Sequence, residues 1–200
     1  ANTNSAGTVA SGLSSDAAAT SFTCSDGSLI GVGSSLLIDS EQLFVSERSN
    51  AQVGSEALTG SVAALQSTVT VPVTTGSNWN AGEVIQVNSE KMLIDSISSN
   101  NLTVQRAYDG SVLAAHSSSD QVHGFRVLTV ERGANGTTAA THSNSTAISV
   151  YSMPHDIKLL TLRSAIATFY QMESGDSRTL TADLERYRDM VLHGYSAGRG

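Results

Sequence analysis

Residues 102–117, Leu-Thr-Val-Gln-Arg-Ala-Tyr-Asp-Gly-Ser-Val-Leu-Ala-Ala-His-Ser, are followed by a second copy at residues 128–143, Leu-Thr-Val-Glu-Arg-Gly-Ala-Asn-Gly-Thr-Thr-Ala-Ala-Thr-His-Ser. Eight of the sixteen aligned positions are identical, at an offset of 26 residues. Upstream, residues 36–45 match residues 85–94 at an offset of 49 residues. Two repeated segments with different offsets predict a duplicated unit in which one copy is interrupted.

One glutamate and one arginine in each copy indicate how the copies are arranged. Glu90 and Arg106 are 16 residues apart, whereas their counterparts Glu41 and Arg132 are 91 residues apart. The outer pair therefore encloses 75 additional residues, enough for a small β-domain that enters and leaves through neighbouring points of a host loop. The sequence predicts two similar β-lobes, with an inner copy inserted into an outer copy.

The predicted fold class is α+β, mainly β. Short β-prone runs alternate with Gly, Asn and Asp turns from Phe22 to Tyr151, and helical spacing begins only after Pro154. Residues 1–20 are almost wholly Ala, Ser, Thr, Gly and Asn, which predicts too little burial to order them. In chain order the predicted parts are a flexible arm (1–20), the first part of the outer β-lobe (21–49), the inserted inner β-lobe (50–123), the second part of the outer lobe (124–152), a two-helix hairpin (153–192) and a flexible tail (193–200).

The C-terminal residues carry two apolar stripes at helical spacing. The first stripe has apolar side chains at intervals of three and four, and Ser174-Gly175-Asp176-Ser177 then interrupts it. The second stripe follows this break, so a helical hairpin is predicted, which either covers the β-lobes or contacts another subunit. The interface candidates on the hairpin are Leu159, Leu162, Ile166, Phe169, Tyr170, Leu184, Tyr187 and Val191.

Polar residues recur at matching positions of the two copies and raise the question of a catalytic or metal site. Carboxylates and imidazoles are general acid–base groups and metal ligands. Neither copy has paired ligands at metal spacing, however, and a duplication also copies residues that hydrogen-bond turn carbonyls. We therefore interpret the set as structural and predict no catalytic residue, no cofactor and no metal. The repeated residues are Glu41 and Glu90, Arg106 and Arg132, Gly110 and Gly136, and His116 and His142.

Composition narrows the function classes further. The formal net charge is −7 and charged residues make up 14% of the chain, which disfavours a sequence-specific nucleic-acid partner. The one cysteine, Cys24, cannot form an internal disulfide and is expected to be buried. No apolar run approaches transmembrane length, and residues 1–20 lack a signal-peptide pattern. We expect a protein that has no membrane partner and is made in a cytoplasm.

The repeated unit resembles a β-motif of phage virion proteins, in which an apolar strand, a small turn, a Glu and a second strand precede Leu-Thr-Val, Arg-Gly, Gly-Thr and His. The inner copy carries it at residues 87–94, Val-Asn-Ser-Glu-Lys-Met-Leu-Ile, and at residues 102–116. The outer copy keeps Arg132-Gly133, Gly136-Thr137 and His142. The inner copy departs from the motif, with Ala and Ser in place of the Gly of Arg-Gly and the Thr of Gly-Thr.

The C-terminal stretch supplies a second resemblance. Residues 153–163, Met-Pro-His-Asp-Ile-Lys-Leu-Leu-Thr-Leu-Arg, continuing to Tyr170, are similar to the helix of phage head-to-tail connector (adaptor) proteins. Together the resemblances imply a homo-oligomeric, twelve-fold neck ring in the virion, beneath the portal, with the portal and tail or head-closure proteins as partners. The implied role is assembly and DNA passage, not catalysis. Typical small adaptors are mostly helical, so the large β-region departs from that family.

Two other function classes fit parts of the pattern. A tail, baseplate or capsid-decoration protein would share the β-repeat but need not dock through the helices. A carbohydrate-binding module would present a sugar site on the β-lobes, yet aromatics at 5% and one Trp supply no obvious stacking platform. An enzyme is the weakest alternative, because the sequence has no phosphate-binding loop, nucleophile elbow or paired-cysteine motif.

Overall fold

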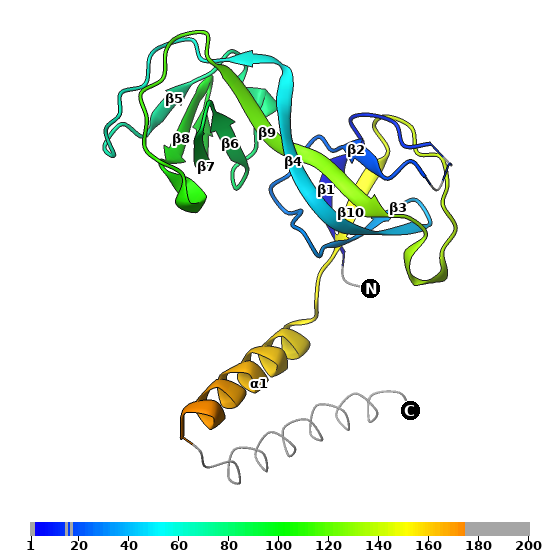
Figure 1. The fold of residues 1–200 in the computed structure, drawn as a ribbon. Coiled ribbons are helices and arrows are strands. Elements are labelled where there is room, and N and C mark those ends of the chain that lie inside the picture. The colour runs from blue at the N-terminus through cyan, green and yellow to red at the C-terminus, as the bar shows by residue number, and fades with distance from the viewer. Residues whose placement is uncertain (1–2, 15, 17, 175–200) are drawn as a thin grey trace. The chain divides into compact units, whose positions relative to one another are not determined.

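A computed structural model of the chain describes residues 3–14, 16 and 18–174, with side chains for all of these except residues 155, 156 and 170–174 (Figure 1). Contacts divide the chain into a β body, Thr3–Tyr151, and a C-terminal unit that begins at Ser152. The β body consists of strands, short 3-10 turns and loops, and the C-terminal unit contains the helix α1 (His155–Ser174).

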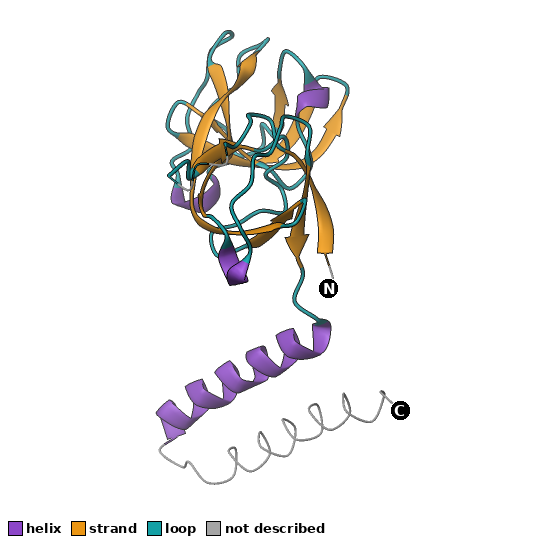
Figure 2. Cartoon of the chain, turned by 90° about the vertical axis from the view of Figure 1, so that its right-hand side faces the viewer, coloured by secondary structure: helices purple, strands orange, loops and turns teal. Residues whose placement is uncertain are grey.

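The strands of the β body pair into one antiparallel, ten-stranded sheet (Figure 2). Their order across it is β1-β10-β3-β4-β9-β6-β7-β8-β5, and β2 pairs with β9 outside this path. The 3-10 turns are η1 (Gly76–Asn78), η2 (Tyr108–Gly110) and η3 (Ala134–Gly136). The strands are β1 (Thr3–Thr8), β2 (Ser21–Thr23), β3 (Ser35–Ile38), β4 (Glu41–Ala57), β5 (Thr70–Pro72), β6 (Val84–Val87), β7 (Glu90–Ser98), β8 (Asn101–Gln105), β9 (Gln121–Glu131) and β10 (Ala147–Tyr151).

The structure corrects the predicted fold class. The prediction was an α+β fold, mainly β, with two nested β-lobes and a two-helix hairpin. The structure is mostly β, its strands form one continuous sheet that encloses two cores, and the described residues contain one α-helix instead of two. The sheet is continuous because β4 and β9 are long, pair with each other and run through both copies of the repeat (Figure 1). The stretch predicted as the second helix, with Leu184, Tyr187 and Val191, and the predicted tail 193–200 lie outside the described residues.

The sheet encloses two separate hydrophobic clusters. Alternate strand residues point to opposite faces, so each strand contributes every second side chain to a core. The outer core is formed by Ala6, Val9, Leu13, Phe22, Cys24, Ile30, Leu36, Ile38, Leu43, Val45, Leu128, Val130 and Ile148. The inner core is formed by Leu58, Val62, Val71, Val73, Trp79, Ile85, Val87, Met92, Ile94, Leu102, Val104 and Val122.

The two cores are surrounded by strands that pair in the same register. Leu37 of β3 lies opposite Ser149 of β10, and Gln86 of β6 lies opposite His123 of β9. These pairs are related by the sequence offsets of 49 and 26 residues. The repeat is therefore a repeat of strand pairing and not of short sequence motifs alone.

Isolated bridges bring the ends of each strand set together. Val9 bridges to Cys24 in the outer lobe, and Leu58 bridges to Val73 in the inner lobe. Each lobe is therefore a small closed barrel. The first part of β4 and the last part of β9 belong to the outer barrel, whereas their other halves belong to the inner barrel.

Residues 3–14 belong to the outer barrel and are not a flexible arm. β1 pairs with β10, from Thr3 opposite Tyr151 to Thr8 opposite Ala147. Its Ala6, and Val9 and Leu13 beyond it, are buried in the outer core. The prediction of a flexible arm was wrong because it was based on the low number of apolar residues in the segment. It did not consider where these few apolar residues lie.

Helix α1 begins directly after Pro154. The amide of Lys158 donates to the carbonyl of Pro154 over 3.0 Å, and proline fits the first turn because it has no amide hydrogen to leave unpaired. Leu162, Ile166 and Phe169 are 56%, 47% and 60% exposed, whereas Ala167 is buried. None of the helices among the described residues is long and apolar enough to cross a membrane.

Candidate functional site

Glu90, the first residue of β7, is the centre of a buried ion cluster in the inner lobe. The side chains of Glu90, Arg106 and His116 have no solvent exposure. Arg106 donates from Nε to Glu90 Oε1 and from Nη2 to Glu90 Oε2, each over 2.8 Å. His116 Nε2 lies 2.8 Å from the same Oε2. The paired arginine bonds fix both orientation and charge, as bidentate carboxylate contacts do.

The inner cluster also holds several stretches of backbone. The amides of Ala107 and Ala114 donate to the Glu90 carboxylate, each over 3.0 Å. Arg106 donates from Nη1 to the carbonyls of Ala63 and Thr68 over 3.0 and 3.1 Å, and from Nη2 to the carbonyl of Ala114 over 2.6 Å. All the N–H groups of the guanidinium thus have acceptors. Through these bonds the cluster holds two loops, one with Ala63 and Thr68 and one with Ala107 and Ala114, against the start of β7.

The outer lobe repeats this arrangement around Glu41. Arg132 donates from Nε and Nη2 to the two Glu41 oxygens over 2.7 and 2.9 Å, and His142 Nε2 lies 2.8 Å from Oε2. The amides of Gly133 and Ala140 donate to the carboxylate over 3.0 and 2.9 Å. The other acceptors of Arg132 are the carbonyls of Ser14, Ala19 and Ala140. The Glu, Arg and His side chains therefore form the same hydrogen-bonded cluster in both copies.

Both buried carboxyls are held in the ionised form. Burial by itself would raise the pKa of Glu41 and of Glu90. Hydrogen bonds from the arginine, from backbone amides and from the histidine outweigh burial and lower the pKa of each from 4.5 to about 2. The carboxylate in each cluster therefore stays ionised across the neutral pH range and accepts hydrogen bonds from the loop amides.

The turns beside the two clusters have matching backbone conformations. Ala107 and Gly133 have φ of 54° and 61°, and Gly110 and Gly136 have φ of 72° and 79°. Only glycine adopts this left-handed region without steric cost. The inner copy therefore keeps the loop conformation although Ala107 replaces the glycine of the motif.

A further buried ion pair joins β9 to the residues before β6. Arg126 donates to Glu83 from Nε over 2.7 Å and from Nη2 over 2.6 Å, and its guanidinium carbon lies 5.2 Å from the centre of the Trp79 ring. Glu83 also accepts from the amide of Gly27 over 2.8 Å. Sequence reasoning missed this pair because neither Glu83 nor Arg126 has a charged counterpart in the outer copy.

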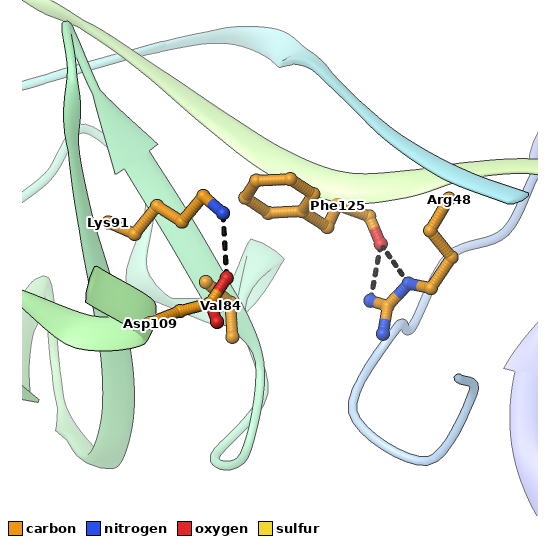
Figure 3. Close-up of a pocket in the computed structure, with 5 residues that line it drawn as sticks. All are labelled: Arg48, Val84, Lys91, Asp109 and Phe125. Atoms are coloured by element: carbon orange, nitrogen blue, oxygen red, sulfur yellow. Dashed lines mark hydrogen bonds and ion pairs between the residues drawn. The ribbon is translucent and has the colours of Figure 1, made fainter. Parts of the chain in front are cut away.

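A hollow of about 160 Å³ is lined by Arg48, Val84, Lys91, Asp109 and Phe125 (Figure 3). Arg48 donates to the carbonyl of Phe125 from Nε and Nη2, over 3.2 and 2.5 Å. Lys91 Nζ lies 2.7 Å from Asp109 Oδ2 and 5.4 Å from the centre of the Phe125 ring. The charged side chains that line this hollow are therefore already hydrogen-bonded or ion-paired within the protein.

The interface candidates of the helical stretch are only partly within the described side chains. Leu162, Ile166 and Phe169 are exposed, and Leu159 is half-buried. The side chain of Tyr170 lies outside the described set, as do the candidates on the predicted second helix. The exposed side chains lie four and three residues apart, so they form one stripe along α1.

Among residues 3–14, 16 and 18–174, no group of three or more His, Cys, Asp or Glu side chains is placed to hold a metal ion. Comparison of the chain with known proteins found no matching family model, no matching curated protein and no matching solved structure.

Proposed function

We propose that the chain is a structural component of a tailed-phage particle, a subunit of the head-to-tail connector ring beneath the portal. The observation that carries this proposal is the apolar stripe of α1, in which Leu162, Ile166 and Phe169 are exposed. An exposed apolar stripe on an amphipathic helix is typical of a surface that packs against another protein. In the proposed ring, this stripe contacts the portal or a neighbouring subunit.

The β body suits a scaffold role in such a ring. In each lobe the glutamate, arginine and histidine that could have supplied acid–base chemistry bond to one another and to loop backbone. The carboxylate oxygens and the guanidinium groups hold the loops through these bonds. The body is thus a rigid double barrel, and its loops are available as contact surfaces for tail or head-closure proteins.

The resemblances and the charge support the same position in the particle. The repeated β-motif resembles segments of phage virion proteins, and residues 153–170 resemble the helix of connector proteins. The net charge is −7. Negative charge repels DNA phosphates, so a negatively charged channel does not trap DNA during its passage. The location proposed on these grounds is the neck of the virion.

Electron microscopy of intact particles tests the position directly. Gold-labelled antibodies raised against the whole chain are bound to the particles, and the labelled region is averaged with symmetry. We expect label at the neck and twelve-fold averages. Label on the capsid lattice or at the tail tip would overturn the connector assignment and favour a decoration or baseplate protein.

A helix variant tests the surface that carries the proposal. Leu162→Glu with Ile166→Glu adds two charges to the stripe, and we expect loss of ring or portal binding in co-sedimentation with assembled heads. Thr161→Glu with Thr168→Glu adds the same charges to exposed polar positions of α1 and serves as the control. Equal binding by the two double variants would contradict the proposed contact.

A further inference from the structure

A polar groove crosses the outer surface of the inner barrel. It has a volume of about 440 Å³, which is within the size range of roughly 300–1,000 Å³ for small-molecule sites. It lies where β4, β9 and β6 run side by side (Figure 1). Its lining includes Asn50, Gln86, Asn88, Asp120, Gln121 and His123.

Hydrogen bonds between these side chains fix their positions before any ligand arrives. Asn50 Nδ2 donates to Gln86 Oε1 over 2.9 Å, and Gln86 Nε2 donates to the carbonyl of Asn88 over 2.8 Å. Asn88 Nδ2 then donates to Asp120 Oδ2 over 3.0 Å. This chain of bonds leaves the amide oxygens of Asn50 and Asn88 and the second oxygen of Asp120 available as acceptors. The groove is thus a preorganised array of polar groups.

The duplication provides an internal control for what the fold requires. The outer barrel has the same strand pairing at the matching positions, with Leu37 opposite Ser149 where the inner barrel has Gln86 opposite His123. The outer copy therefore forms its barrel without the side-chain amides of Gln86 and Gln121 and without the imidazole of His123, whereas Asp39, Ser145 and Thr146 keep polar side chains at the positions of Asn88, Ser119 and Asp120. The inner residues Gln86, Asp120, Gln121 and His123 correspond to Leu37, Thr146, Ala147 and Ser149 of the outer copy. Because the outer barrel folds without these amide and imidazole groups, the fold alone does not account for them, and a ligand does.

The lining determines the class of ligand. It contains no lysine or arginine, and it includes the carboxylate of Asp120, so it disfavours an anion. It has no aliphatic side chain and no Phe, Tyr or Trp, so it disfavours a hydrophobic ligand. The side-chain amides, the Asp120 carboxylate, the Ser119 hydroxyl and the His123 imidazole supply both donors and acceptors. Sugar hydroxyls need both, because each can donate and accept.

We infer that this groove binds a neutral saccharide. The inference goes beyond the proposed structural function and does not depend on the position of the chain in a particle, since any exposed subunit would offer the groove to a surface glycan. Recognition rests on hydrogen bonds and not on ring stacking, so we expect weak binding of one sugar unit, in the millimolar range.

Saturation-transfer NMR on the full chain tests the inference, because it detects weak ligands whatever the size of the assembly. The probes are glucose, galactose, mannose and N-acetylglucosamine, with N-acetylneuraminic acid as the anionic comparison. We expect saturable transfer to at least one neutral sugar. No saturable transfer to any neutral sugar, or tighter binding of the anionic one, would overturn the inference.

A double variant identifies the groove as the site. Gln86→Leu with His123→Ser installs the side chains that the outer barrel already carries at these positions, so the fold is expected to survive. We expect sugar binding about tenfold weaker or lost, because the Gln86 amide is removed and the His123 imidazole is replaced by a shorter hydroxyl group. Ser149→Ala, on the outer barrel, is the matched control and is expected to bind as the natural chain does. Unchanged binding in the double variant would rule out the groove.

Discussion

His142 Nδ1 lies 2.9 Å from Asp39 Oδ2, so both ring nitrogens of this histidine contact a carboxylate. In the inner lobe the matching His116 Nδ1 is buried and has no hydrogen-bond partner among the described residues. The difference arises because Asn88 replaces Asp39 in the inner copy, and its side chain bonds to Asp120 instead. Two nearly identical clusters therefore differ by one contact.

We expect Asp39→Ala to destabilise the protein more than Asn88→Ala. Both positions have a left-handed backbone, with φ of 52° and 54°, so the backbone cost is common to the two variants. The first variant also leaves a buried imidazole nitrogen unpaired, which costs about 1–3 kcal/mol. Urea unfolding followed by circular dichroism gives the difference. Equal destabilisation would mean that the contact of Asp39 with His142 adds nothing to stability.

Removal of the Glu90 charge has a much larger predicted effect. Glu90→Gln leaves Arg106 buried without its anionic partner, and breaking such a pair costs about 3–5 kcal/mol. The control is Lys91→Ala, which breaks a partly exposed pair with Asp109 that is worth about 0–1 kcal/mol. Both are measured by urea unfolding. A cost for Glu90→Gln as small as that for Lys91→Ala would contradict the role given to the inner cluster.

The pKa values of Glu41 and Glu90 predict how stability depends on pH. Each folded-state pKa is about 2, below the ordinary value of 4.5. The stabilisation is complete above the unfolded-state pKa and is lost as the pH falls through the folded-state pKa. We expect the urea midpoint to stay level above about pH 6 and to fall between about pH 5 and pH 2. Glu41→Gln and Glu90→Gln, each measured as a single variant, are expected to fall less steeply over this window, and slopes equal to that of the natural chain would argue against the assignment.

The sequence predicted the repeated residues but not the path of the chain around them. Glu41 and Glu90 recur at fixed offsets, so duplication alone reveals them. The role of β1 was hidden because its pairing with β10 is non-local and its residues are mostly small and polar. The continuity of the sheet was hidden because β4 and β9 each combine the end of one copy with the start of the other. Glu83 and Arg126 recur nowhere, so no pattern could have paired them.

Two glycines are predicted to tolerate alanine very differently. A Cβ atom on Gly76 would lie 1.9 Å from the carbonyl oxygen of Ser99, which forces the backbone to move. Gly76→Ala is therefore expected to cost at least about 2 kcal/mol. Gly110 has φ of 72° and open space around it, so Gly110→Ala is expected to cost only about 1 kcal/mol. Urea unfolding distinguishes these values, and the reverse order would contradict the close approach at Gly76.

The buried thiol of Cys24 offers a probe of whether the two barrels open separately. Burial raises the pKa of this thiol from 9.0 to about 11, and Sγ donates to the carbonyl of Arg126 over 3.3 Å. Reaction with an aromatic disulfide reagent therefore requires opening of the outer core, and we expect it to be at least about a hundredfold slower than in urea. Glu41→Gln, which weakens the outer cluster, is expected to accelerate labelling far more than Glu90→Gln.

The matching probe for the inner core is Val73→Cys in a Cys24→Val background, because Val73 occupies the position of Cys24 in the inner barrel and is equally buried. With this probe we expect the order to reverse, so that Glu90→Gln accelerates labelling more than Glu41→Gln. Equal acceleration by both variants at both probes would show that the long strands β4 and β9 couple the barrels into one cooperative unit, since local openings would then be absent.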